Sequence, residues 1–103
     1  TNEDELVVNI IKKMRKLGIS QIPVLKDNLP VGIVTETTII EHLDGDISTL
    51  KVCEVMKECP PMISLNAKKS MVADMLKHYS ILIVYDKGKI KGIISKSDLL
   101  GSY

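Results

Sequence analysis

The chain lacks Phe and Trp entirely and has only three Tyr in 103 residues. It therefore offers few aromatic stacking platforms, and its core has to be built from Ile, Leu, Val and Met. The longest apolar run has five residues, whereas a helix that crosses a bilayer needs about 20. The net charge is close to zero, because the chain has 14 basic and 13 acidic residues. Composition thus argues against a membrane span and against a net field that attracts nucleic acid.

Cysteine is scarce, and the N-terminus lacks a secretory pattern. Residues 1–5 are mainly acidic, without the basic and apolar regions of a signal peptide. Outside the secretory pathway, Cys53 and Cys59 are expected to be reduced thiols of a cytoplasmic protein. The five residues between them are a looser spacing than structural zinc sites use, and no Ser-His-Asp or Cys-His pattern marks a catalytic centre. We therefore expect no metal and no enzymatic activity.

The sequence contains an internal repeat at an offset of 60 residues. Apolar, glycine and hydroxyl residues recur in the same order, which is how repeated structural units show themselves in a sequence. An amphipathic segment precedes each copy, and it aligns after a shift of one residue. The matched positions are Val24 with Val84, Gly32 with Gly92, Thr35 with Ser95, Thr37 with Ser97, and Ile39-Ile40 with Leu99-Leu100.

Each copy predicts a helix, a hairpin and a second helix. Apolar residues at helical spacing favour a helix over residues 6–17, ended by Gly18 in a left-handed cap, and a shorter helix over 71–76. Runs of Ile, Leu and Val separated by Asp, Asn and Gly favour two hairpins. A copy of this size cannot bury its own apolar face, so we expect the two to pack together. The expected strands are 22–25 with 31–34 and 81–85 with 90–94; the second helices are 36–43 and 96–100; a linker covers 44–49, a short helix 52–56 and a strand 62–64.

The ordered motifs of both copies resemble those of cystathionine-β-synthase-type (CBS) repeats. Residues 18–24 and 32–35 are similar to the signature of one repeat, residues 51–56 resemble the V-x-x-V-M opening of a second, and residues 92–100 match its closing motif. The resemblance implies an α+β fold of two pseudo-symmetric βαββα-type repeats packed sheet to sheet. The repeats are expected at residues 1–49 and 50–103, with the first strand of the first repeat missing because the chain begins at its helix.

By this resemblance, an adenosyl ligand binds in a cleft between the repeats. Asp98 is the carboxylate placed to accept both ribose hydroxyls, and Ser95 and Ser97 donate to ribose or phosphate oxygens beside the helix start. Ser95 with Asp98 three residues later is also close to a capping box, which stabilises a helix without any ligand. Both roles stay open at this point, and they are compatible.

The resemblance also implies that the partners of Asp98 come from the other repeat. Ile19 and Ile22 are candidates for sandwiching adenine, and Ser20 and Gln21 are candidates for reaching its polar edge. Alternatively, both isoleucines belong to the core and the two polar residues simply face solvent. For Ile22 the core interpretation is favoured.

A second cleft, formed by the equivalent residues of the first repeat, is expected to be weaker. Thr38 stands where the second repeat has Asp98, and it follows Thr35, the equivalent of Ser95. A hydroxyl cannot accept from both ribose oxygens as a carboxylate can. We therefore expect this cleft to bind weakly or to be empty.

The surroundings of the expected cleft are poor in cations. Nucleotide-binding relatives often have Arg or His just before the second strand, whereas this chain has Ser20-Gln21 and Ser80-Ile81. Additional phosphates would then be poorly neutralised. This favours S-adenosylmethionine or methylthioadenosine over ATP. AMP remains possible, because Lys96 and the helix start can share one phosphate.

The resemblance implies a regulatory, ligand-sensing module that controls an attached output domain. The repeats are similar to those attached to helix-turn-helix transcription regulators, so DNA is expected as a partner only through a missing N-terminal domain. The alternative is a structural or dimerisation module without a ligand. In both cases we expect no membrane partner and a homodimer, formed by the helices that contain Ile39-Ile40 and Leu99-Leu100.

Overall fold

The computed structural model describes residues 1–101. It divides into two compact units, Thr1–Cys59 and Pro60–Tyr103, and each is described by itself. Both units are mixed α+β with one three-stranded sheet, so the predicted fold class is confirmed. The boundary between the units lies after residue 59, ten residues later than the expected repeat boundary at residue 49. The reason is that residues 52–58, which are expected to open the second repeat, join the core and the sheet of the first unit. The repeat bounds themselves stay a prediction.

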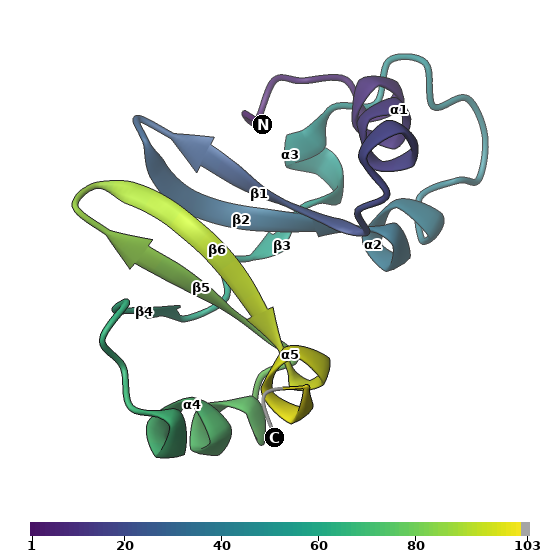
Figure 1. The fold of residues 1–103 in the computed structure, drawn as a ribbon. Helices are drawn as coiled ribbons and strands as arrows, with labels where there is room; N and C mark the ends of the chain where they lie inside the picture. Colours follow the sequence, from purple (N-terminus) through teal and green to yellow (C-terminus); the bar gives the residue numbers. More distant parts are fainter. Residues whose placement is uncertain (102–103) are drawn as a thin grey trace. The chain divides into compact units, whose positions relative to one another are not determined.

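The first unit combines three helices with an antiparallel sheet of order β1-β2-β3 (Figure 1). The expected helices and hairpin form where the sequence places them, except that the second helix ends earlier than expected. The strand β3, which pairs with β2 through Gly32 and Ile33, was not expected. The elements are α1 Val7–Leu17, β1 Gln21–Lys26, β2 Leu29–Thr35, α2 Glu36–Ile40, α3 Val52–Val55 and β3 Lys57–Glu58.

The second unit repeats this plan with one difference in its third strand. In this sheet, of order β4-β5-β6, β4 runs parallel to β5, while β5 and β6 form the antiparallel hairpin. The helices α4 and α5 lie on one side of the sheet (Figure 1). The elements are β4 Met62–Ile63, α4 Lys69–Leu76, β5 Ile81–Asp86, β6 Lys89–Ser95 and α5 Lys96–Leu100.

The two hairpins have the same turn and the same irregularity. Asp27 and Asn28 have φ of 52° and 65°, and Lys87 and Gly88 have φ of 49° and 76°. Positive φ at both central residues is the signature of a type I′ turn, whose twist matches that of the strands it joins. In both hairpins the register also shifts at one equivalent point, after Val24 in one and after its counterpart in the other. The repeat therefore extends to backbone detail.

Helix α1 is amphipathic and ends as predicted. Ile10 and Met14 are buried on one face, and Lys and Arg residues occupy the exposed face. Gly18 adopts φ +66° and donates its N–H to the carbonyl of Met14, and the N–H of Ile19 reaches the same carbonyl at 3.1 Å. This left-handed cap satisfies a helix end that would otherwise lack partners.

The expected alignment of the helices is wrong by one residue. The buried pair Ile10 and Met14 of α1 corresponds to the buried pair Val72 and Leu76 of α4, an offset of 62 residues rather than 61. The path from the last buried helix residue to the strand is therefore two residues longer in the first unit, from Met14 to Gln21, than in the second, from Leu76 to Ile81. Helix α1 continues to Leu17 after Met14, whereas α4 ends at Leu76. Because Arg15 and Lys16 are polar, the apolar repeat pattern could not show where the two additional residues lie.

The start of the chain contacts β1 where the expected first strand would lie. Asn2 forms a single parallel bridge with Leu25, whose N–H donates to the carbonyl of Thr1 at 2.8 Å. This bridge has the orientation of the β4–β5 pairing in the second unit. In the first unit this single parallel bridge therefore takes the position that the β4–β5 pairing has in the second unit.

Each unit has its own hydrophobic core between the sheet and the helices. The buried residues of both cores are branched aliphatics, with Met14 in the first core as well, and they pack without Phe or Trp. The buried cluster of the first unit is Val7, Ile10, Met14, Ile22, Val24, Val34, Ile39, Val52 and Val55, and that of the second is Ile63, Val72, Leu76, Leu82 and Val84.

Candidate functional site

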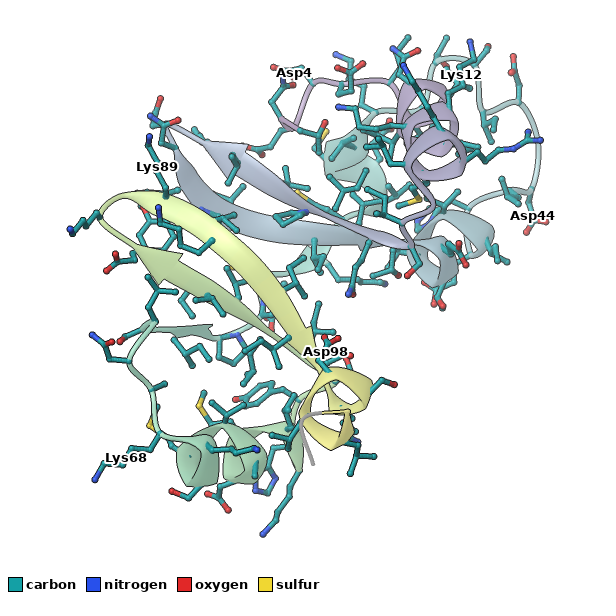
Figure 2. All side chains as sticks on the ribbon, viewed as in Figure 1. Asp4, Lys12, Asp44, Lys68, Lys89 and Asp98 are labelled. Carbon is teal, nitrogen blue, oxygen red and sulfur yellow. The ribbon has the colours of Figure 1, made fainter. Side chains whose placement is uncertain are left out.

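Asp98 lies at the start of α5, directly after β6 (Figure 2). The N–H of Ser95 donates to Asp98 Oδ2 at 2.8 Å, and Ser95 Oγ donates to the same oxygen at 3.1 Å. In return, the N–H of Asp98 donates to Ser95 Oγ at 3.4 Å. The capping box is therefore present, and it fixes the position of the carboxylate relative to the helix.

The cap uses only half of the hydrogen-bonding capacity of the Asp98 carboxylate. All of its hydrogen bonds within residues 1–101 go to Oδ2, which leaves Oδ1 available as an acceptor. Asp98 and its neighbours Lys96 and Ser97 are exposed. A carboxylate held in place by one oxygen and open at the other can accept a hydroxyl donor from solution. The two roles predicted for Asp98 are thus geometrically compatible.

The equivalent position of the first unit is closed. Thr38 is only 5% exposed, and its Oγ1 donates to the carbonyl of Thr35 and accepts from the N–H of Thr35, both at 3.0 Å. The N–H of Thr38 donates to Thr35 Oγ1 at 3.2 Å. The threonine pair is therefore a complete cap, which sequence reasoning missed because capping boxes usually have Glu or Gln at the third position.

The segment from Ile19 to Ile22 joins α1 to β1 beside the start of α2. Ser20 accepts from the N–H of Glu36 at 3.1 Å through its carbonyl, and Gln21 pairs with Thr35 across the β1–β2 ladder. Ile22 belongs to the core of the first unit, which confirms the interpretation that was favoured for it. Ile19 is 38% exposed and Ser20 is exposed, so these two remain accessible.

The structure thus brings the predicted residues together in two separate groups. In the first unit Ser20 and Gln21 adjoin the closed threonine cap. In the second unit Ser95, Ser97 and Asp98 share the start of α5. The grouping of Asp98 with the segment from Ile19 to Ile22 joins residues of different units, and it stays a prediction.

Each unit also has an apolar groove between its first and second helices. The grooves have volumes of about 270 Å³ in the first unit and about 300 Å³ in the second. At their rims Ile40 is 64% exposed and Leu100 is 72% exposed, whereas Ile39 is buried. The lining residues are Ile11, Met14, Arg15, Glu36, Ile39, Ile40 and Leu43 in the first groove and Ala73, Leu76, Lys77, Lys96, Leu99 and Leu100 in the second.

Other chemical features of the described residues are few. Within residues 1–101 no group of three or more His, Cys, Asp or Glu side chains is arranged to hold a metal ion. Neither Cys53 nor Cys59 forms a disulfide, and partial burial raises the pKa of Cys59, which disfavours its thiolate. The same residues include no helix with the length and apolarity of a membrane span.

Comparison with known proteins identifies the family. The model of the CBS domain matches residues 1–45 and again residues 52–103. A crystal structure of a CBS domain is 28% identical, covers 99% of this chain and 84% of its own, and superposes with a TM-score of 0.79.

Two further structures have the same fold. A CBS domain-containing protein of unknown function from Bacillus anthracis is 20% identical, with 99% of this chain and 80% of its own covered at a TM-score of 0.85. The CBS domains of a transcriptional regulator from Streptococcus pneumoniae are 20% identical, with 97% and 84% covered at a TM-score of 0.77. Two family matches in tandem, on two units with the same plan, show that this chain is a pair of CBS domains and belongs to the CBS domain family.

Proposed function

We propose that this CBS pair is a regulatory module that binds an adenosyl compound and controls an attached output domain. The observation that carries the proposal is the Asp98 carboxylate, which is fixed by Ser95 through Oδ2 and has Oδ1 open toward solvent. A ribose diol is a suitable partner, since its two hydroxyls can donate to one carboxylate. S-adenosylmethionine, methylthioadenosine and AMP all have this group.

The output domain is proposed to act on DNA. The fold is shared with the CBS domains of a transcriptional regulator, and this likeness supports the proposal. Ligand binding would then favour one conformation of the module over another, and this shift would change the DNA affinity of the output domain. Two cysteines that do not form a disulfide suit a reducing compartment, and we place the protein in the cytoplasm.

The first test compares the two equivalent positions, Asp98 and Thr38. Asp98→Ala is expected to weaken adenosyl binding more than tenfold, because a charge-assisted hydrogen bond contributes about 1.5–3 kcal/mol. Thr38→Ala is expected to change binding little, since the Thr38 hydroxyl is already engaged by Thr35. Isothermal titration calorimetry against S-adenosylmethionine, methylthioadenosine, AMP and ATP measures both effects.

Asp98→Asn is the matched control for the cap. Its amide oxygen can still accept from the N–H of Ser95, so α5 keeps its start, whereas the negative charge is lost. Weaker binding by both Asp98 variants, with unchanged thermal unfolding of the Asn variant, would assign the effect to the carboxylate. Equal losses from the Asp98 and Thr38 substitutions would contradict the choice of site.

The second test concerns ligand charge. We expect S-adenosylmethionine or methylthioadenosine to bind more tightly than ATP, with AMP between them, because each additional phosphate brings charge that must leave water. Helix α5 has one cation, Lys96, which stands two positions before Asp98. Competition titrations at low and moderate salt give the ranking. Tightest binding of ATP at both salt concentrations would refute the argument from the lack of cations.

A second candidate function is supported by the exposed apolar residues of the two grooves. Isolated large side chains are common on surfaces, but Ile40 and Leu100 each rim an apolar groove at equivalent positions of the repeat. We therefore propose that the chain also forms a homodimer through these helices. Light scattering at micromolar concentrations tests the proposal, and a monomer would contradict it.

A further inference from the structure

Charge is distributed unevenly between the two units. The first unit has seven basic and ten acidic residues, whereas the second has seven lysines and only three aspartates. Their net charges are therefore −3 and +4, which together give the +1 of the whole chain. The near-zero net charge of the chain thus describes neither unit, and the second has a positive field of its own.

Three of the lysines of the second unit lie on the β5–β6 hairpin (Figure 1). Lys87 is in the turn, and Lys89, labelled in Figure 2, and Lys91 follow on β6. All three are exposed, and within residues 1–101 none of them forms an ion pair. The one acidic residue of the hairpin, Asp86, stands opposite Lys89 in the ladder. The hairpin therefore keeps an excess of positive charge at its end.

The equivalent hairpin of the first unit lacks these charges. At the offset of 60 residues, the three lysines correspond to Asp27, Leu29 and Val31. The turns have the same conformation, with φ of 52° at Asp27 and 49° at Lys87. Because the same hairpin forms with Asp, Leu and Val, the fold does not require a lysine at any of these positions.

Within the described part of the chain, the end of the β5–β6 hairpin is a ribbon of two strands. Strand β4 pairs with β5 at Ile83 and Val84, whereas the β5–β6 ladder continues beyond them to Asp86 and Lys89. On the side of β6, a Cβ on Gly92 meets nothing within 4 Å. Paired strands lie about 4.8 Å apart, and the major groove of B-DNA, about 12 Å wide, admits such a ribbon.

We infer that this basic ribbon, residues 85–91, contacts the phosphate backbone of duplex DNA. Backbone contacts need cations, whereas an interface with a protein generally has an apolar centre. The exposed residues of the ribbon are Lys87, Gly88, Lys89 and Lys91, which offer charge without an apolar anchor. The contact is additional to any that an output domain makes with DNA, and it does not rest on the adenosyl site. It also uses none of the residues that line the two grooves.

The first experiment removes the charges of the ribbon. Lys87→Gln/Lys89→Gln/Lys91→Gln is expected to weaken binding of a short DNA duplex more than tenfold at low salt. The slope of log affinity against log salt concentration should become shallower by about 2–3, because each phosphate contact contributes about 0.9. Fluorescence anisotropy over a salt series measures both quantities. The corresponding Arg variant should bind as the wild type does, and circular dichroism checks that each variant is folded.

Lys12→Gln/Lys13→Gln/Lys16→Gln is the matched control. It removes the same number of charges from exposed lysines of α1, in the acidic first unit. Since these lysines lie outside the ribbon, affinity and salt dependence should stay close to those of the wild type. Equal losses from the two triple variants would mean that overall charge drives binding and would overturn the inference.

The second experiment transfers charge to the first hairpin. Asp27→Lys/Leu29→Lys should keep the fold, because Lys87 already has the turn conformation of Asp27 and Leu29 is 53% exposed. A second basic ribbon is then expected to tighten DNA binding several-fold and to steepen its salt dependence. An unchanged affinity would contradict the claim that lysines on this hairpin are sufficient for the contact.

Other polyanions test the assignment to DNA. Duplex RNA should bind more weakly, because its major groove is deep and narrow, and vesicles of anionic lipid should bind weakly to a ribbon without an apolar anchor. Equal or tighter binding of either would overturn the assignment.

The lysines of β6 have one structural alternative, since lysine on an open strand edge opposes pairing between chains. Self-association of the Gln variant with unchanged DNA binding would establish that role and overturn the inference. The adenosyl proposal is judged separately, because calorimetry with adenosyl ligands should give the same result for the Gln variant and the wild type.

Discussion

Leu82→Ala is expected to lower the free energy of unfolding by about 2–5 kcal/mol, the range for removing a large buried aliphatic side chain. Leu82 is 0% exposed and lies in the core of the second unit, on the middle strand β5. Its removal costs both the transfer of the side chain from water and the cavity left behind. Because this core has no aromatic ring and few large residues, little can move in to fill that cavity.

Leu65→Ala is the matched control, with the same substitution in the same unit. Leu65 is 55% exposed, so the expected change is within about 0.5 kcal/mol. Urea unfolding followed by circular dichroism, at one protein concentration for both variants, measures the difference. Similar losses for the two leucines would contradict the burial of Leu82 and the sheet order that places it at the centre.

Gly32→Ala and Gly92→Ala are expected to have opposite effects, although the two glycines are equivalent in the repeat. A Cβ on Gly32 would lie 2.8 Å from the carbonyl oxygen of Lys57 and 3.0 Å from Met56 Sδ. Relieving this clash requires β3 to move, at a cost of about 1–3 kcal/mol. A Cβ on Gly92 meets nothing within 4 Å. Alanine there reduces the freedom of the unfolded chain and should stabilise by about 0.4–1 kcal/mol.

Thermal unfolding of the two alanine variants beside the wild type tests this difference in sign. Amide exchange gives an independent readout, because only Gly32→Ala should speed exchange in Lys57 and Glu58, which pair with β2. If both variants are equally destabilised, β3 does not make the close approach to β2 that distinguishes the two sheets.

The hairpins were predictable because their signals are local. Runs of Ile, Leu and Val favour strands, and a type I′ turn needs residues that tolerate positive φ, such as Asn28 and Gly88. Gly18 was predictable as a cap for the same reason. The cap of α5 could also be read from the sequence, since Ser95 and Asp98 have the spacing of a capping box.

The remainder depends on contacts that leave no local signal. Strand β3 has two exposed charged residues, Lys57 and Glu58, and it is a strand only because β2 is beside it. The capping box of α2 has Thr38 at its third position, where Glu or Gln is usual. The equivalence of α1 and α4 became visible only when the helices were aligned by their buried residues, because two additional residues between Met14 and β1 hide it in the sequence.

The placement of β3 has a consequence for synthesis. Folding during translation starts at the N-terminus, and domains generally fold as units. The first unit, however, takes Val52 and Val55 into its core and Lys57 into its sheet. A nascent chain that has emerged only through the first hairpin and α2 therefore holds an open strand edge and an incomplete core. The sequence up to about Cys59 therefore has to leave the ribosome before the first unit can complete its core and its sheet. We expect stable folding of the first unit only after the middle of the chain has been synthesised.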